Sequence, residues 1–222
     1  MNALIVYWHP EPRSFNGALF RTACETLAER GHAIRTSDLY EMRFDPVSGR
    51  HNFTTVADPG FFKQQMEELH ATEQKRFSGE IEAEMQKLEW CDLLILQFPL
   101  WWFGLPAVLK GWVDRVFAMG RIYGMGRIYD TGVFKGKRAM LSLTTGGPEE
   151  AYRRGGFNGD IAAILRPIQR GILQFVGFSV LEPHIVFEPA HLSADQRRQK
   201  LEQYANRLRT LADEPPIEVG SY

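Results

Sequence analysis

The stretch from residue 92 to residue 106 has the sequence DLLILQFPLWWFGLP. Its first part, 92–98, is a short and continuous apolar run, which is typical of a strand buried on both faces of a parallel sheet. A turn rich in aromatic residues follows, with Trp101, Trp102 and Phe103 in succession. Pro106 then suits the first position of a helix. The stretch therefore predicts a buried strand, a tight aromatic turn and a helix.

Strands and helices alternate along the rest of the chain. Further strands are predicted at 3–8, 33–39, 138–145 and about 178–187, and amphipathic helices at about 16–30, 80–89, 161–175 and 193–212, besides the one that begins at Pro106. Residues 40–78 form a long excursion with one helix expected near 60–71, and such excursions are more often functional than idle. Strands separated by helices imply right-handed crossovers. The predicted fold is α/β: a flavodoxin-like, doubly wound sheet of five parallel strands in the order 2-1-3-4-5, in three α/β/α layers.

Length and charge limit the organisation of the chain and its partners. The 222 residues contain neither a repeat nor a linker, so a single domain is expected over 1–213, with 214–222 as a surface tail. Lys and Arg (26) nearly balance Asp and Glu (27), which leaves no electrostatic argument for nucleic acid or an anionic membrane as a partner. Neither a signal peptide nor an apolar run of about 18 residues is evident, so the expected location is cytoplasmic.

Cysteine and histidine give no sign of a metal site. Cys24 and Cys91 lack metal-ligand spacing and are expected to be two buried free thiols. The six histidines show no ligand spacing either, so no metal is assigned.

Three loops should share one edge of the predicted sheet, because they follow the carboxyl ends of the first, third and fourth strands. The loop 9-HPEPRSFN-16 ends at a helix start, where N–H groups and the helix dipole favour a phosphate; alternatively, Ser14 or Asn16 merely caps the helix. The loop 99-PLWWFG-104 exposes aromatic side chains to a flat ligand, unless they pack beneath residues 40–78. The loop 144-TTGGP-148 allows close backbone approach, or is only a turn. Together they indicate a flavin nucleotide site.

The motifs resemble one family in particular. Residues 6–19, 92–117, 141–147 and 164–178 are similar to the NAD(P)H:quinone oxidoreductases of the DT-diaphorase type, and the similarity runs from about residue 3 to residue 208. The resemblance implies a homodimer with one flavin in each of two sites near the subunit interface, FAD in first place and FMN as the alternative. It also implies ping-pong chemistry: NAD(P)H delivers hydride and leaves, and a quinone or related small aromatic acceptor then takes two electrons in the same pocket.

The resemblance also assigns residues to roles. Tyr152 is implied as the catalytic residue, standing beside the pyrimidine side of the flavin. Cofactor contacts are implied for His9, Ser14, Phe15, Asn16, Pro99, Leu100, Trp101, Trp102, Phe103, Thr144, Thr145, Gly146, Gly147, Tyr152 and Arg197. The nicotinamide and acceptor pocket is implied to involve Trp102, Phe103, Tyr123, Met125, Asn158 and Phe175. Two departures stand out: Asn158 takes the place of a histidine of the mammalian enzymes, and the chain stops soon after its last predicted helix, where the family continues.

Two other functions fit a flavodoxin-like chain. One is a regulatory subunit that docks on a membrane transporter, with reductase activity as a secondary property. The other is an electron-carrier flavodoxin. The net charge of −1 argues against the carrier, because carriers present a strongly charged docking face.

Overall fold

The central element of the molecule is a twisted parallel sheet. The computed structural model describes residues 1–220. Its strands lie in the order β2-β1-β3-β4-β5, and β6 also pairs with β4. The order predicted from the sequence is therefore confirmed. The strands are β1 (Asn2–Tyr7), β2 (Ala33–Asp38), β3 (Leu93–Pro99), β4 (Arg138–Thr145), β5 (Ser179–Val180) and β6 (His184–Phe187).

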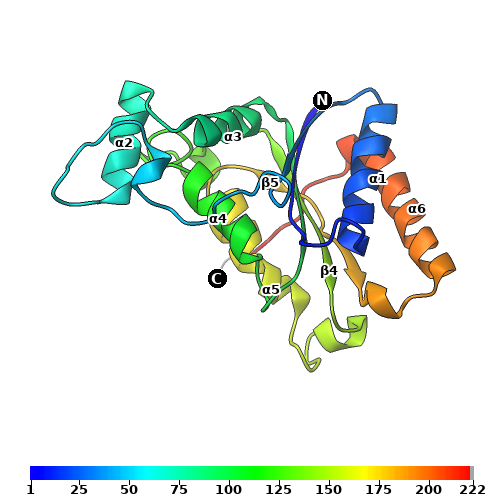
Figure 1. Ribbon diagram of the computed structural model, residues 1–222. Helices are drawn as coiled ribbons and strands as arrows, with labels where there is room; N and C mark the ends of the chain where they lie inside the picture. The colour runs from blue at the N-terminus through cyan, green and yellow to red at the C-terminus, as the bar shows by residue number, and fades with distance from the viewer. Residues whose placement is uncertain (221–222) are drawn as a thin grey trace.

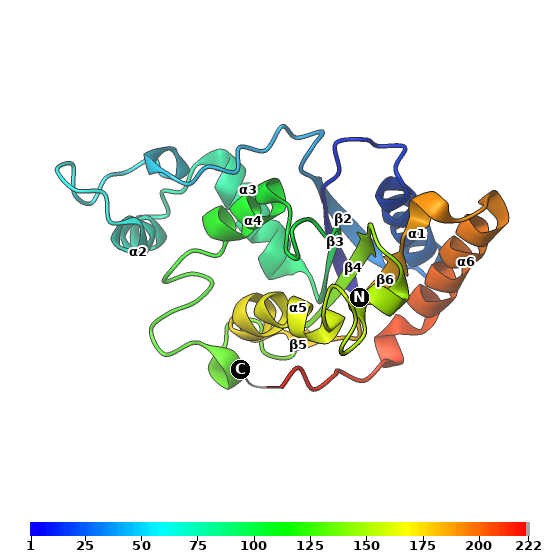
Figure 2. The same ribbon diagram turned by 90° about the horizontal axis from the view of Figure 1, so that it is seen from below.

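Helices cover both faces of the sheet (Figures 1 and 2). One face carries α1 (Phe15–Glu29) and α6 (Ala194–Thr210), and the other carries α3 (Gly79–Trp90), α4 (Ala107–Val116) and α5 (Ile161–Ile168). The central strand β3 is buried along its whole length, which explains its unbroken apolar run. After α5 the chain continues as a π-helix over Gln169–Gln174.

The last predicted strand is divided in two. The apolar pattern predicts one strand at about 178–187, whereas the structure has β5 and β6 separated by residues 181–183, which include Pro183. Arg138 of β4 pairs with Ser179, and Ser142 of β4 pairs with His184. An advance of four residues along β4 therefore corresponds to an advance of five residues from β5 to β6. Proline cannot donate to the sheet, and the extra residue bends the strand as a bulge does.

The segment after α6 is not a free surface tail, contrary to expectation. Ile217 donates its N–H to the carbonyl of Val180 in β5 (2.8 Å). The Arg138 guanidinium donates to the carbonyl oxygens of Ala212 (2.6 Å) and Glu214. Val219 is buried in the core cluster. The segment 214–219 therefore covers the outer edge of β5, because apolar side chains within it find apolar partners there.

The excursion 40–78 has its own supports. Its helix, α2, spans Gln64–Gln74 rather than 60–71, and it projects away from the sheet (Figures 1 and 2). The buried Glu67 carboxylate accepts hydrogen bonds from the N–H groups of Ala57 (2.7 Å) and Asp58 (3.2 Å). These bonds hold the pKa of Glu67 below its usual value, so the carboxylate stays charged while it holds the loop in place.

Cys24 and Cys91 are free thiols, as predicted, although Cys24 is only half-buried. Among residues 1–220, no helix combines the length and the apolar character needed to cross a bilayer. The same residues contain no group of three or more His, Cys, Asp and Glu side chains arranged to hold a metal ion.

Candidate functional site

The three loops singled out by sequence analysis meet at the carboxyl edge of the sheet. Leu100 donates its N–H to the carbonyl of Thr144 (2.8 Å), which joins the second loop to the third. Asn16 donates from Nδ2 to Thr144 Oγ1 (2.6 Å), which joins the first loop to the third. This edge is where open α/β sheets bind ligands, at the switch point between β1 and β3.

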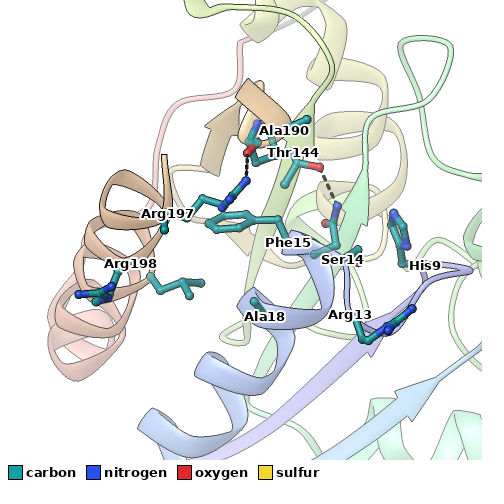
Figure 3. Close-up of a pocket in the computed structure, with 13 residues that line it drawn as sticks. His9, Arg13, Ser14, Phe15, Ala18, Thr144, Ala190, Arg197 and Arg198 are labelled. Atoms are coloured by element: carbon teal, nitrogen blue, oxygen red, sulfur yellow. Dashed lines mark hydrogen bonds between the residues drawn. The ribbon is translucent and has the colours of Figure 1, made fainter. Parts of the chain in front are cut away.

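A pocket of about 610 Å³ opens beside these loops (Figure 3). It lies between the start of α1 and the start of α6, so the N-termini of two helices border it. Helix N-termini favour negative charge. The pocket is lined by His9, Arg13, Ser14, Phe15, Asn16, Ala18, Thr144, Pro189, Ala190, Ala194, Arg197, Arg198 and Leu201.

The first loop presents donors to this pocket. Ser14 does cap α1, since its Oγ accepts the N–H of Gly17 (3.1 Å), but its hydroxyl hydrogen is left for another partner. His9 Nδ1 lies within hydrogen-bond distance of both the N–H (3.0 Å) and the carbonyl oxygen (3.1 Å) of Glu11, and these contacts hold the ring in place. Burial lowers the pKa of His9, which favours the neutral imidazole. His9 can therefore contact a ligand through Nε2 without carrying charge.

Arg197 is the arginine of the pocket best placed to bind an anion. Arg13 is paired with Glu11 (3.1 Å) and Arg198 with Asp195 (3.2 Å), both at exposed positions. Arg197 is half-buried and donates only to the carbonyl of Pro189 (3.4 Å) within the described part of the chain. Figure 3 shows Arg197 reaching from α6 toward Phe15 at the start of α1. Its charge is thus available to a phosphate or carboxylate in the pocket.

The aromatic turn is strained and exposed. Trp101 and Gly104 exchange backbone hydrogen bonds (3.0 and 3.2 Å), which leaves Trp102 and Phe103 as the two central residues. Both have positive φ, +50° and +59°, in the region that favours glycine. Trp102 is 97% exposed and Phe103 50% exposed. They do not pack beneath residues 40–78, so that structural alternative is wrong. A strained backbone that holds aromatic rings in solvent indicates a binding role.

The two residues that precede the aromatic turn are buried. Pro99 and Leu100 are buried and can offer a ligand little beyond their backbone. Trp101 packs edge-to-face against Trp8, with ring centroids 5.0 Å apart. Trp101 nevertheless remains 44% exposed, so it stays accessible to a flat molecule together with Trp102 and Phe103 at the tip of the turn.

The third loop brings Tyr152 and Asn158 together at Gly147. A Cβ at Gly147 would lie 3.4 Å from both the Tyr152 ring and the Asn158 Nδ2, so the chain fits closely there. Thr145 donates its hydroxyl to the carbonyl of Gly147 (2.8 Å), which fixes the turn. The N–H of Asn158 donates to the carbonyl of Ala151 (2.8 Å) and keeps that segment folded over the glycine. Gly146 stays exposed with open space above it.

Part of the predicted acceptor pocket lies elsewhere. Tyr123 and Phe175, whose rings are 5.8 Å apart, line a second pocket of about 660 Å³ beside α2 and α4. None of the three loops contributes to that pocket. Met125 is 75% exposed on the segment that follows Tyr123. Within one chain these residues do not join the aromatic turn.

Sequence reasoning also missed several residues of the first pocket. They are Arg13, Ala18, Pro189, Ala190, Ala194, Arg198 and Leu201. Five of the seven lie between Pro189 and Leu201, in the short helical turn before α6 and in the first turns of α6, and this segment lies beside α1 only after folding. Ser193 before α6, with Gln196 three residues later, forms a capping box and was a signal that could have located this second helix N-terminus.

The fold and this edge agree with known proteins. A family described as having a flavodoxin-like fold matches residues 1–211. The chain belongs to this family. Among its relatives, the rat protein named ribosyldihydronicotinamide dehydrogenase [quinone] is 43% identical over 215 residues, covering 96% of this chain and 93% of the relative. The rat NAD(P)H dehydrogenase [quinone] 1 is 45% identical over 216 residues, covering 97% and 79%.

A solved structure gives the same result for this flavodoxin-like chain. A putative quinone reductase from Klebsiella pneumoniae superposes with a TM-score of 0.94 at 42% identity, over 98% of this chain and 87% of that one. The resemblance to the NAD(P)H:quinone oxidoreductases that the motifs indicated is therefore confirmed.

Proposed function

We propose that this protein is a flavin-dependent oxidoreductase that uses NAD(P)H to reduce quinones or related aromatic acceptors by two electrons. The observation that carries the proposal is the strained turn of Trp102 and Phe103, held in solvent by a loop that Leu100 joins to Thr144. The names of the two rat relatives and of the Klebsiella pneumoniae structure, which are quinone dehydrogenases and a putative quinone reductase, support the same reaction.

The residues present fit a flavin nucleotide. An aromatic face, a glycine loop that permits close approach and a pocket bordered by two helix N-termini suit a flat ring with a phosphate tail. Trp102, Phe103 and the loop 144–147 would hold the ring, while Ser14, His9 and Arg197 would hold phosphate. We favour FAD over FMN because the pocket continues from α1 to a second helix N-terminus at α6, farther than a single phosphate requires.

The flavin supplies the hydride chemistry, and the protein supplies binding and orientation. We infer that Tyr152 is the catalytic residue and that its hydroxyl donates a hydrogen bond at the edge of the bound ring, where negative charge develops during reduction. Asn158, which is also close to Gly147, can donate a second hydrogen bond but cannot change its charge. Trp102 and Phe103 keep water from one side of the acceptor.

The acceptor pocket is proposed to be completed by a second copy of the chain. Tyr123, Met125 and Phe175 form an aromatic and thioether surface that this chain does not bring to its own aromatic turn. In a homodimer, this surface of one subunit can close the site of the other. A cytoplasmic location is proposed with it, because NAD(P)H is a cytoplasmic reductant.

Steady-state kinetics of the flavin-loaded protein test this function. NADPH, NADH and dihydronicotinamide riboside, the donor class named by the rat relative, would each be varied against a small quinone. Parallel double-reciprocal lines are expected, since donor and acceptor use one pocket in turn. Loaded protein that oxidises none of the three donors when quinone is present would refute the proposal.

A further inference from the structure

A row of polar side chains crosses the otherwise apolar face of the sheet beneath α1 and α6. Tyr7, Gln97, Ser142 and His184 are register partners on β1, β3, β4 and β6, so they stand side by side on one face. The next row on the same face, two residues earlier on each strand, is Ile5, Ile95 and Met140. A single row of polar side chains in an otherwise apolar core needs a physical explanation.

Most polar atoms of this row find no partner. Gln97 and Ser142 are fully buried, and Tyr7 nearly so. The Tyr7 hydroxyl, Gln97 Oε1, Ser142 Oγ and His184 Nε2 make no hydrogen bond within residues 1–220. An unpaired buried polar atom lowers the stability of the folded protein, so these side chains do not stabilise the core. The one bonded contact of the row leads toward the candidate site.

That contact starts a directed chain of hydrogen bonds. Gln97 donates from Nε2 to Asn16 Oδ1 (2.7 Å), and Asn16 then donates from Nδ2 to Thr144 Oγ1 (2.6 Å). Asn16 and Thr144 are both largely buried, and both line the pocket between α1 and α6. Because Thr144 Oγ1 accepts from Asn16, the Thr144 hydroxyl hydrogen must point to another acceptor.

We propose that Gln97 is a positioning residue: through Asn16 it directs the hydroxyl hydrogen of Thr144 into the pocket, toward an acceptor atom of the bound ligand. This rests on the proposed function only for the identity of that ligand, a flavin nucleotide. Gln97 itself lies one layer below the pocket and does not line it. If the Gln97 amide no longer held Asn16 Oδ1, the Asn16 amide could turn over and accept from Thr144, and the pocket would lose a donor.

The test titrates FAD, and separately FMN, into the flavin-free protein and follows the quenching of flavin fluorescence. Gln97→Met removes both polar atoms at similar length, and the dissociation constant is expected to rise about tenfold, the loss of one hydrogen bond. Ser142→Ala is the matched control, since Ser142 is the buried neighbour of Gln97 in the row and does not contact Asn16. It should stay within about twofold of wild type.

A double variant separates positioning from a general loss of structure. In a Thr144→Val background the hydroxyl is absent, so Gln97→Met should have no further effect on the dissociation constant. If Gln97→Met raises the dissociation constant by the same factor in the Thr144→Val background as in wild type, the proposal is wrong. It is also wrong if the Gln97→Met protein binds flavin like wild type. Should Gln97→Met fail to fold, Thr144→Val alone decides, because unchanged affinity there excludes a donated hydrogen bond. A wild-type protein that binds neither flavin would refute the proposed function instead.

Discussion

At the scale of single residues, the most informative feature is a backbone conformation. Trp102 and Phe103 adopt the left-handed conformation that favours glycine, and such positions cost on the order of 1–3 kcal/mol each. Trp102 does not recover this cost by burial, because its side chain is 97% exposed, and half of Phe103 is exposed as well. The chain thus retains large rings where folding alone would favour glycine, and the proposed flavin would give these rings a flat partner.

This conflict between stability and binding can be measured with Trp102→Gly. Glycine relieves the strain, so the flavin-free protein should gain up to about 1 kcal/mol in free energy of unfolding. Flavin binding should weaken by about 0.5–1.5 kcal/mol, because one stacking face is lost. Thermal melts of both forms and a flavin titration give the two values. Phe61→Gly, an exposed aromatic position without positive φ, is the control and should leave flavin affinity unchanged. Equal destabilisation of both forms would place Trp102 in the folding core.

Asn158 gives a second prediction at this scale. Its amide, close to Gly147 and Tyr152, cannot titrate, whereas a histidine there would change charge near pH ~6.5. The rate of flavin reduction should therefore show no step due to this position between about pH 5.5 and 7.5, and Asn158→His should introduce one. Stopped-flow reduction by NAD(P)H across this range, with Tyr152→Phe in parallel, measures it. A wild-type step that Asn158→His leaves unchanged would assign the proton to another group.

At the scale of elements, the sequence predicted most of the sheet because the signals were local. Continuous apolar runs marked β1, β3 and β4, and the helices after them showed amphipathic spacing. The break between β5 and β6 was missed because 178–187 is apolar overall, although Pro183 was visible within it. The packing of residues 214–219 on β5 was missed because it depends on Arg138, far away in sequence. For the same reason, the α6 side of the pocket could not be derived from any local pattern.

The packing of β6 against α6 predicts a pH dependence of stability. His184 stacks on Tyr204 (4.2 Å), and burial, with the nearby charges of Arg207 and Lys200, lowers its pKa to about 4. An unfolded chain takes up a proton at this position near pH ~6.5. Between these values the unfolded state binds more protons than the folded state, so stability falls as the pH is lowered from about 6.5 to 4.

The histidine's share of this loss is at most about 3 kcal/mol. It is measured as the difference between wild type and His184→Gln in urea unfolding at pH 7, 5.5 and 4.5. The difference should shift in favour of the glutamine variant as the pH falls. His191→Gln, at an exposed position, is the control. A constant difference between wild type and His184→Gln over this range would contradict the assignment of a neutral, buried imidazole.

At the scale of the whole molecule, the two pockets explain why the site residues fall into two groups. The turn, the glycine loop and Arg197 lie at one edge, while Tyr123 and Phe175 line a pocket beside α2 and α4. The sequence resemblance placed both groups in one site because it indicates which residues take part in a function. It does not indicate whether those residues come from the same subunit. The proposed second copy would bring the two groups into one site and would give Trp102, which is 97% exposed in the single chain, a neighbour.

A homodimer is therefore expected in solution, and its dissociation should abolish quinone reduction. Light scattering at micromolar concentration should give twice the chain mass. A charge reversal on the second pocket, Lys110→Glu, should weaken the dimer if this surface faces the partner. A monomer with full activity would contradict the composite site.

The proposed function depends on a flavin nucleotide that binds at the carboxyl edge of the sheet, against Trp102 and Phe103. Its most direct test is the absorption spectrum of the purified protein, before and after titration with FAD and FMN, with the released flavin identified by mass. The protein should be yellow, with the absorbance maxima of oxidised flavin, and should carry FAD or acquire it on titration. A colourless protein that gains neither flavin absorbance nor quenched flavin fluorescence from either nucleotide would contradict it.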